Sequence, residues 1–587
     1  MTQKTRGIVI SDLSKVFPKA TVPALNNLSA FIKPGIITGL VGPDGAGKTT
    51  LLRHIAGILK PTKGTIVING FDSIQDSTDI HEFTGYMPQK FGLYEDLSVH
   101  ENLNLYADIF NMSKDERAQR FEKLLHFTNM APFQKRLAGK LSGGMKQKLG
   151  LSCALLRQPE VLLLDEPSVG VDPISRRELW SIVRNMVSEG TTVIWSTAYL
   201  DEAEQCEEVI ALNEGNIVFA GKPQNIFKRV QGRVFESCAI AKNKRKILQN
   251  ILKDENIIDG LIKGASLKII VRDPKTKRPP LPKGNTWSKT SPNFEDGFID
   301  LLGGIQERHS AIAELLTPLE HDPSLKAAIE AQKLTKRFGD FTAAHDINFQ
   351  VEPGEVFGIL GPNGAGKSTT FKMLCGLLKP TEGSPSILGQ DLRTAKALAR
   401  QQIGYMAQKF SLYGNLTSKQ NLSFFAGIYG LTAKESKIAI AEMINTFDLK
   451  AYIDTPTEEL PLGFKQRLAL SCAVMHHPKI LFLDEPTSGV DPLTRREFWL
   501  HINGMIQKGV TVLVTTHFMD EAEYCDRMCL VYKGNIIALG TPDDLKEAVQ
   551  DKGEQLPTLE NTFIKMIERY DAKQQKLYGS QEVSYDT

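Results

Sequence analysis

The sequence predicts an α/β protein built from two copies of one domain, each with a largely parallel sheet. Short β-rich runs alternate with helical stretches, which is the pattern of strands joined by crossover helices. A long segment then recurs at one offset, since Lys48 and Lys367 lie 319 positions apart and so do Asp165 and Asp484. The chain has 587 residues, which is enough for several domains with their own cores. A fixed offset between matching residues indicates a tandem duplication.

The second copy contains a complete phosphate-binding loop of the form G-x-x-x-x-G-K-[ST]. Val356–Leu360 is predicted to be the strand that enters the loop, and Thr369–Leu378 the helix that leaves it. Glycines let backbone N–H groups wrap around phosphate oxygens, and the helix N-terminus adds a positive dipole. We expect Lys367 to reach the β- and γ-phosphates and Ser368 to ligate Mg²⁺. The loop residues are Gly361, Pro362, Asn363, Gly364, Ala365, Gly366, Lys367, Ser368 and Thr369.

The first copy carries the equivalent loop, with Thr49 as the hydroxyl on the metal side. An aromatic side chain near each loop is a candidate for stacking on an adenine: Phe17 in the first copy and Phe338 in the second. A place in the core is the alternative for these rings. The residues of the first loop are Gly42, Pro43, Asp44, Gly45, Ala46, Gly47, Lys48, Thr49 and Thr50.

Each copy also has an apolar strand that ends in two acids. The first is Val161–Leu164, followed by Asp165 and Glu166, and the second ends in Asp484 and Glu485. Two carboxylates at the end of a buried strand are costly unless they do chemistry. The aspartate suits Mg²⁺, held directly or through water. The glutamate suits the polarisation of a water molecule.

Two further motifs lie between the loop and the acidic strand. Gln89 and Gln408 occupy matching Tyr-Met-x-Gln-Lys-Phe segments, which suggests a fixed role near the metal and the attacking water. The first copy then has Leu-Ser142-Gly143-Gly144 at the start of an apolar helix. A serine and two glycines at a helix N-terminus form an anion site. An ordinary helix cap is the alternative, because serine is a good one.

Phosphate loop, glutamine, L-S-G-G and acid-ended strand, in this order, resemble an ATP-binding cassette (ABC) ATPase with two fused cassettes. The resemblance covers nearly everything except a basic insertion and the far C-terminus. His517 with the following Phe-Met-Asp-Glu-Ala-Glu is similar to the drug- and polymer-exporter branch. The resemblance implies two P-loop cassettes, each with a parallel-rich sheet and a helical subdomain, that use ATP and Mg²⁺. It also implies that the cassettes pair head to tail, and that separate transmembrane permease subunits dock near the glutamine loops.

The two copies differ from the family pattern at two places. The catalytic histidine at the strand end is present as His517, but the first copy has Ala198, which has no ring, donor or acceptor. The signature of the second copy reads Leu-Pro461-Leu462-Gly. Pro461 removes the serine hydroxyl and a backbone N–H, and Leu462 puts a branched side chain where the backbone should approach phosphate.

Head-to-tail pairing places both departures in the same site. Each preorganised donor lost from a site of this kind costs roughly 2.7–4 kcal/mol, or 10²–10³ in rate. We therefore expect one hydrolytic site and one that binds ATP and hydrolyses it poorly, with the two cassettes of one chain as partners. The expected intact site contains Lys367, Asp484, Glu485 and His517 with Ser142, Gly143 and Gly144; the other contains Lys48, Asp165, Glu166 and Ala198 with Pro461 and Leu462.

The repeat breaks once, where the first copy is 54 residues longer than the second, between about residues 231 and 290. The extra segment is rich in lysine and arginine and contains Pro279-Pro-Leu-Pro. A solvated regulatory subdomain is one interpretation, and contact with lipid headgroups or a partner is the other. The predicted divisions are cassette 1 at 1–230, its basic extension at 231–302, a linker at 303–327, cassette 2 at 328–549 and a tail at 550–587.

Composition narrows the function classes. Lys+Arg 70 against Asp+Glu 68 leaves a net charge of +2, so no global field favours nucleic acid. No run approaches the roughly 18 apolar residues of a membrane span, and the N-terminus predicts no signal peptide.

We expect a peripheral ATPase on the cytoplasmic face of the inner membrane that energises an exporter of drugs or other small molecules. The alternative is a soluble twin-cassette ATPase that acts on the ribosome, although such proteins usually keep both signatures. A DNA-repair role lacks the expected coiled-coil insertion and zinc cysteine pair.

Overall fold

A six-stranded sheet carries the first phosphate loop. Five of its strands are parallel, and β10 pairs antiparallel with β9 at one edge. The computed structural model describes residues 6–18, 22–89, 92–305, 308–320, 322–394, 401–408, 411–551 and 555–579, so parts of the predicted linker and tail lie outside the described residues. In sheet order the strands are β10 (Asn216–Gly221), β9 (Glu208–Asn213), β3 (Ile37–Val41), β8 (Thr192–Thr197), β7 (Val161–Asp165) and β6 (Thr84–Met87).

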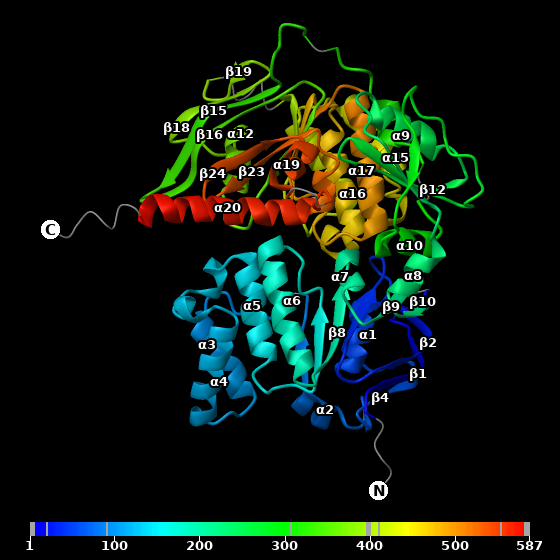
Figure 1. The fold of residues 1–587 in the computed structure, drawn as a ribbon, viewed down its shortest axis with the longest axis vertical. Helices are drawn as coiled ribbons and strands as arrows, with labels where there is room; N and C mark the ends of the chain where they lie inside the picture. The colour runs from blue at the N-terminus through cyan, green and yellow to red at the C-terminus, as the bar shows by residue number, and fades with distance from the viewer. Residues whose placement is uncertain are drawn as a thin grey trace, which may run out of the picture. The chain divides into compact units, whose positions relative to one another are not determined.

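A second, antiparallel sheet and a group of helices complete the first cassette. Helices α3 and α4 form the helical subdomain, which packs through α5 and α6 toward β8 (Figure 1). The antiparallel strands are β2 (Leu25–Ile32), β1 (Ile8–Lys15), β4 (Lys63–Ile68) and β5 (Phe71–Asp72). The helices are α1 (Lys48–Ile55), α2 (Ser77–Phe83), α3 (Val99–Ile109), α4 (Lys114–Phe127), α5 (Gly143–Ala154), α6 (Pro173–Ser188), α7 (Leu200–Glu204), α8 (Gln224–Arg229) and α10 (Phe294–Leu301).

The second cassette repeats this topology. Its large sheet is again parallel except for the edge strand β24. The large-sheet strands are β20 (Ile403–Met406), β21 (Ile480–Asp484), β22 (Thr511–Thr515), β17 (Val356–Leu360), β23 (Arg527–Tyr532) and β24 (Asn535–Gly540); the antiparallel sheet contains β16 (Phe341–Val351), β15 (Ile329–Phe338), β18 (Glu382–Ile387) and β19 (Gln390–Asp391). The helices are α11 (Ala311–Leu315), α12 (Lys367–Leu374), α14 (Ser418–Ile428), α15 (Ala433–Thr446), α16 (Leu462–Val474), α17 (Pro492–Gln507), α18 (Met519–Ala522), α19 (Pro542–Val549) and α20 (Leu559–Gly579).

The central strands are apolar because both of their faces are covered. Every residue of β7 and β21 is buried, and the four apolar residues of each strand are at most 1% exposed. Parallel strands enclosed on both faces are expected to be continuous apolar runs rather than alternating ones. The predicted fold class, two tandem α/β cassettes with parallel-rich sheets, is confirmed.

The basic insertion folds into a small antiparallel sheet with one helix. Residues 232–290 belong to one compact unit with 305–488 and 494–587, whereas 1–231, 291–304 and 489–493 form the other unit. The segment predicted as an extension of the first cassette is therefore divided between the two units. Its elements, in sheet order, are β12 (Ile257–Lys263), β13 (Ser266–Val271), β11 (Val234–Ser237) and β14 (Trp287–Lys289), with α9 (Lys244–Leu252).

Partly and fully buried polar contacts join this inserted subdomain, residues 232–290, to the second cassette. Arg245 donates to the Asp526 carboxylate at 2.8 Å, to the Tyr524 carbonyl at 2.9 Å and to Asn503 at 3.1 Å. The Arg496 guanidinium lies 3.2 Å from the Asp259 carboxylate, and both side chains are almost fully buried. Paired buried charges of this kind hold a fixed register, because leaving one partner without the other is strongly unfavourable.

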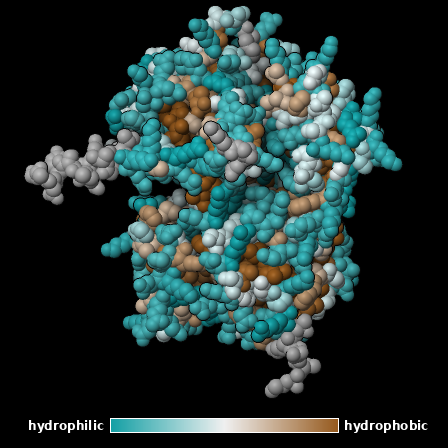
Figure 2. Space-filling view, in the orientation of Figure 1, coloured by the Kyte–Doolittle hydropathy of each residue, from teal (hydrophilic) through white to brown (hydrophobic). Residues whose placement is uncertain are grey.

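Each cassette ends in a helix that packs on its own body. Helix α10 contacts α7 and α8, and its Phe294 and Phe298 are fully buried in the core of the first cassette. Helix α20, red in Figure 1, contacts α18, α19 and β24 of the second cassette. The face seen in Figure 2 is mostly hydrophilic, with apolar side chains in small separate patches. Among the described residues, no helix combines the length and apolar character that crossing a bilayer requires.

Candidate active sites

Both phosphate loops need glycine for physical reasons. A Cβ at Gly361 would lie 2.2 Å from the Val531 carbonyl oxygen. Gly366 has φ +105°, and a Cβ there would lie 2.3 Å from the Ala343 carbonyl oxygen. Gly47 in the first cassette has the same left-handed backbone, with φ +104°. The loops can therefore keep this tight path only with these glycines.

The lysine of each phosphate loop donates hydrogen bonds to the first two residues of its own loop. The Lys48 ammonium donates to the carbonyl oxygens of Gly42 at 2.8 Å and Pro43 at 3.2 Å. Lys367 makes the same contacts in the second cassette, at 2.7 and 3.0 Å. Both lysines are about 5% exposed. Each cassette therefore holds a buried cation next to the backbone N–H groups that would surround a phosphate.

The two predicted glutamates share an unusual backbone. Glu166 has φ +51° and Glu485 has φ +48°, in the left-handed region that non-glycine residues rarely adopt. The Glu166 N–H donates to the Ser196 carbonyl at 3.0 Å, and the Glu485 N–H donates to the Thr515 carbonyl at 3.0 Å. Strain of this kind persists only where the surroundings hold it, and it concentrates at functional sites.

The structure brings each predicted glutamine to its glutamate. The Gln89 amide donates to Glu166 Oε2 at 2.6 Å, and the Gln408 amide donates to Glu485 Oε2 at 2.7 Å. Sequence reasoning placed these glutamines near the metal and the water. The direct contact adds a physical role, because an amide donor fixes the direction of the carboxylate.

The cassettes differ at the position of the predicted catalytic histidine. In the second cassette, His517 Nδ1 lies 3.2 Å from Glu485 Oε2, and both side chains are at most 5% exposed. In the first cassette the equivalent residue is Ala198, which is 1% exposed and offers no polar atom. Glu166 forms an ion pair with Lys48, whose ammonium lies 3.8 Å from Oε1.

This difference accompanies pKa shifts of the two glutamates in opposite directions. Burial raises the pKa of Glu485, but His517, Lys367 and the Gln408 hydrogen bond outweigh it and hold the pKa at about 2. Burial also raises the pKa of Glu166, and there Lys48 and Gln89 do not compensate, so the pKa stays above its usual value. Without a histidine, the first cassette stabilises its carboxylate less well.

Replacing His517 by alanine should move the acid limb of the pH–rate profile to higher pH. A base must be ionised, and the ionised fraction falls as the pH falls through the pKa of Glu485. Removing His517 takes away the main group that lowers this pKa, so the pKa rises and activity is lost at a higher pH. Steady-state ATP turnover between pH 4 and 9 measures the shift: the wild type should show no acid limb from Glu485 in this range, whereas His517→Ala should lose turnover toward its acid end. His477→Asn, which changes an exposed histidine of the same cassette, should leave the limb in place; an unmoved limb in His517→Ala would contradict the assignment.

The predicted metal residues supply oxygen atoms of the right kind. Thr49 Oγ1 donates to Asp165 Oδ1 at 3.2 Å, and Asp484 accepts from Thr515 Oγ1 at 2.6 Å. Burial raises the pKa of Asp165 and of Asp484, against these hydrogen bonds. Within the described part of the chain, no group of three or more His, Cys, Asp or Glu side chains could hold a metal ion by itself. One carboxylate and one hydroxyl fit an Mg²⁺ ion that arrives with nucleotide phosphates.

The signature helices start differently. Ser142 caps α5, because its hydroxyl accepts from the Met145 N–H at 3.4 Å. Pro461 precedes α16 and makes no side-chain cap hydrogen bond, yet the helix begins normally at Leu462. The second cassette therefore keeps the helix and loses the hydroxyl. Gly143 and Gly144 follow the cap in α5, and a Cβ at Gly144 would lie 2.8 Å from Ser175 Oγ.

In each cassette, sequence reasoning missed a buried glutamate that holds the turn after one strand of the large sheet, β8 in the first cassette and β22 in the second. Glu202, fully buried, accepts from Thr197 Oγ1 at 2.6 Å and from Trp195 Nε1 at 2.9 Å. Glu521 accepts from Thr516 Oγ1 at 2.8 Å in the second cassette. The repeated D-E-A-E segment was the available signal, but acids at a helix start are usually solvated. These glutamates fix the turn that bears Ala198 or His517.

The candidate adenine residues lie on the surface. Phe17 is 40% and Phe338 51% exposed, and each has a lysine ammonium over its ring, Lys15 at 5.3 Å and Lys336 at 5.1 Å. A place in the core is therefore excluded for both rings. An exposed aromatic face is available for stacking, which stays a prediction.

Comparison with known proteins decides the family. A family model described as ABC transporter matches residues 25–169 and 344–488. The probable multidrug ABC transporter ATP-binding protein YbhF of Escherichia coli K12 is 55% identical over 569 residues, which cover 96% of this chain and 98% of that protein. The chain belongs to the ABC transporter family. It is an ATP-binding ATPase with two cassettes, and the two matched segments begin at the offset of the internal repeat.

Other ABC proteins match single cassettes. The Nod factor export ATP-binding protein I of Burkholderia pseudomallei strain 1710b is 41% identical over 223 residues, which cover 38% of this chain and 73% of that protein. A solved ATP-binding subunit of an ABC transporter is 29% identical, with a TM-score of 0.38, and covers 41% of this chain and all of its own.

Proposed function

We propose that this ABC protein energises an exporter of drugs or other small molecules by hydrolysing ATP for separate transmembrane permease subunits. The support is the relative YbhF, which matches nearly end to end and is named a probable multidrug ABC transporter ATP-binding protein. In this proposal the chain works at the cytoplasmic face of the inner membrane, where its partners hold it. The relatives named above are transporter and export proteins, so they do not favour the ribosomal alternative.

We further propose that the two ATP sites are unequal. The observation that carries this proposal is the contact between His517 and Glu485 at 3.2 Å, which Ala198 cannot make in the first cassette. The lost cap at Pro461 adds a second defect. With the head-to-tail pairing of the family, Pro461 and Ala198 serve the same site, whereas Ser142 serves the site of His517.

In the intact site, Lys367 and the loop N–H groups bind the phosphates. Mg²⁺ bound with ATP, held by Ser368 and Asp484, would supply charge neutralisation at the phosphates. Glu485 orients the attacking water and accepts its proton, while Gln408 and His517 hold the carboxylate. Ser142 and the Gly143 and Gly144 amides contribute donors from the other cassette. Positioning and electrostatic stabilisation account for catalysis of this kind.

Surface side chains allow a test of the proposed binding to transmembrane permease subunits. An exposed tyrosine lies between each glutamine and the next helix: Tyr94, 58% exposed, precedes α3, and Tyr413, 47% exposed, precedes α14. We expect Tyr94→Asp/Tyr413→Asp to reduce co-purification with membrane proteins at least about tenfold, because buried aromatic anchors carry much of an interface's energy. The measurement is affinity purification of the tagged chain from detergent-solubilised membranes.

A matched variant separates this from a general surface effect. Phe341→Asp changes an aromatic side chain of the antiparallel sheet that is 62% exposed, and it should keep the association. Sedimentation of the wild-type chain with ribosomes instead of membranes would contradict the proposal and favour the alternative.

A further inference from the structure

A basic cavity of about 670 Å³ lies inside the second compact unit, between the inserted subdomain and the second cassette. Five cationic side chains line it, against two carboxylates, Asp526 and Asp543. Its volume falls in the range of sites for small organic molecules. The five cations are Lys242, Lys244, Arg245 and Lys246 of the subdomain and Lys508 of the cassette.

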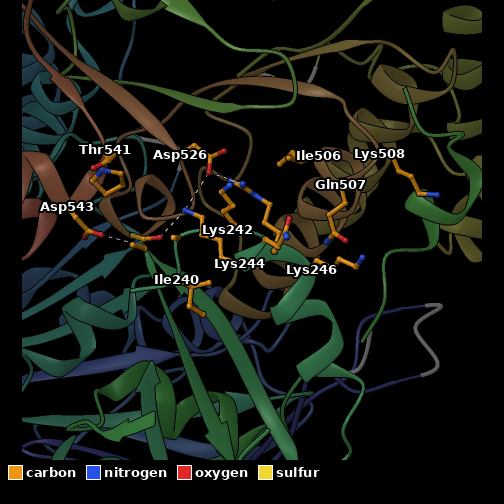
Figure 3. A pocket seen from close by; sticks show the side chains of 16 residues that line it. Ile240, Lys242, Lys244, Lys246, Ile506, Gln507, Lys508, Asp526, Thr541 and Asp543 are labelled. Atoms are coloured by element: carbon orange, nitrogen blue, oxygen red, sulfur yellow. Dashed lines mark hydrogen bonds and ion pairs between the residues drawn. The ribbon is translucent and has the colours of Figure 1, made fainter. Parts of the chain in front are cut away.

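These cations divide into two groups with different tasks. Arg245 donates to Asp526, and the Lys244 ammonium donates to the Gly264 carbonyl at 3.0 Å. The Lys244 ammonium also lies 3.5 Å from the Asp526 carboxylate, and Figure 3 labels both residues. Burial lowers the pKa of Lys244, although Asp526 opposes the shift. This pair therefore holds the subdomain on the cassette, and Asp526 balances part of its charge.

The other three lysines do not hold the subdomain on the cassette. Among the described residues, none accepts a hydrogen bond from, or forms an ion pair with, the side chain of Lys242, Lys246 or Lys508. Lys242 lies just before α9 and Lys246 in its first turn, whereas Lys508 directly follows α17, so the three come from segments that meet only in the tertiary fold. The first cassette has Glu189 in the place of Lys508, so this charge is not a feature common to the two cassettes.

The opposite wall is closed by the subdomain's own backbone. The Ala265 N–H donates to Asp543 at 2.8 Å, and the Gly264 N–H donates to the Glu523 carbonyl at 3.2 Å. Asp543 is thus already engaged by the subdomain. Within the described part of the chain, these three lysines of the lining have no side-chain partner, whereas both carboxylates of the lining are engaged.

We propose that this cavity binds a small anion bearing one or two phosphate groups. Ammonium groups act as point charges for phosphate oxygens, and three of them match the charge of a phosphomonoester or diphosphate. The side-chain amide of Gln507, also in the lining, offers a neutral donor for the remainder of the ligand. The phosphate belongs either to a free metabolite or to the headgroup of an anionic phospholipid. This site is separate from the ATP-binding loops and does not depend on the proposed function.

Calorimetric titration with inorganic pyrophosphate tests the site in the full chain. Lys48→Ala/Lys367→Ala is the common background, because it weakens pyrophosphate binding at both phosphate loops. In this background, Lys242→Glu/Lys246→Glu should weaken pyrophosphate binding at least tenfold. Lys275→Glu/Lys277→Glu makes the same change of net charge at two exposed lysines of the same subdomain outside the cavity, and should change the affinity less than twofold.

Lys508→Glu repeats the test from the cassette side. It installs the negative charge that the first cassette carries at Glu189, and it leaves the Arg245–Asp526 contact untouched. It therefore provides the test even if the double variant does not fold. We expect a loss of pyrophosphate affinity of at least threefold. An unchanged affinity in Lys508→Glu and in the double variant would overturn the proposal, as would an equal loss in the Lys275/Lys277 control.

Vesicle co-sedimentation distinguishes the two sources of phosphate. Binding to phosphatidylglycerol vesicles but not to phosphatidylcholine vesicles, lost in Lys242→Glu/Lys246→Glu, would identify the headgroup as the source. Pyrophosphate binding with no such vesicle binding would identify a free metabolite. Binding of neither pyrophosphate nor phosphatidylglycerol would overturn the proposal.

Discussion

Replacing Glu485 by glutamine should lower ATP turnover by about 10²–10⁴, the contribution expected of a general base. Glutamine keeps the shape of the side chain and removes the charge that His517 and Lys367 stabilise. Glu166→Gln should lower turnover less than about twofold, since the first cassette lacks the histidine and contributes little hydrolysis. The measurement is steady-state phosphate release by each purified variant, together with a count of bound nucleotide.

The bound-nucleotide count serves as the control for this pair. Both variants should still bind ATP, because Lys48 and Lys367 are untouched. Comparable losses of turnover in Glu485→Gln and Glu166→Gln would mean that both sites hydrolyse in turn. In that case the Ala198 and Pro461 changes are tolerated, and the proposal of unequal sites is wrong.

Replacing the signature of the first cassette by that of the second should lower ATP turnover nearly as much as Glu485→Gln does. Ser142→Pro/Gly143→Leu removes a hydroxyl donor and a closely approaching backbone, so we expect turnover to fall by about 10²–10³. The reverse change, Pro461→Ser/Leu462→Gly, should alter turnover less than about twofold, because its site still lacks a histidine. Phosphate release measures both variants.

The chain supplies its own control for folding here. Helix α16 begins normally at Leu462, directly after Pro461, so α5 should also form with proline and leucine at these two positions. Retention of more than half of the wild-type turnover in Ser142→Pro/Gly143→Leu would show that this signature does not serve the site of Glu485. That result would contradict the head-to-tail assignment while leaving the role of Glu485 intact.

The contacts around each glutamate were only partly predictable. Sequence reasoning found Gln408, Glu485 and His517 as separate motifs, and the structure joins the glutamine amide and the histidine ring to the same carboxylate oxygen. The buried role of Glu521 was not predictable, because an acid at a helix start looks solvated until Thr516, the residue directly after β22, is known to donate to it.

The sequence alone determined the two cassettes, their phosphate loops and the unequal motifs. These features are local, since a strand, a glycine-rich turn and a helix follow one another within a few residues, and a missing histidine is visible by comparison of the two copies. Only the tertiary structure decided which body the basic insertion packs against. Arg245 and Asp526 lie 281 positions apart, and no local pattern indicates that they pair. The same packing creates the cavity at Lys242, Lys246 and Lys508, because its charges come from elements that only folding brings together.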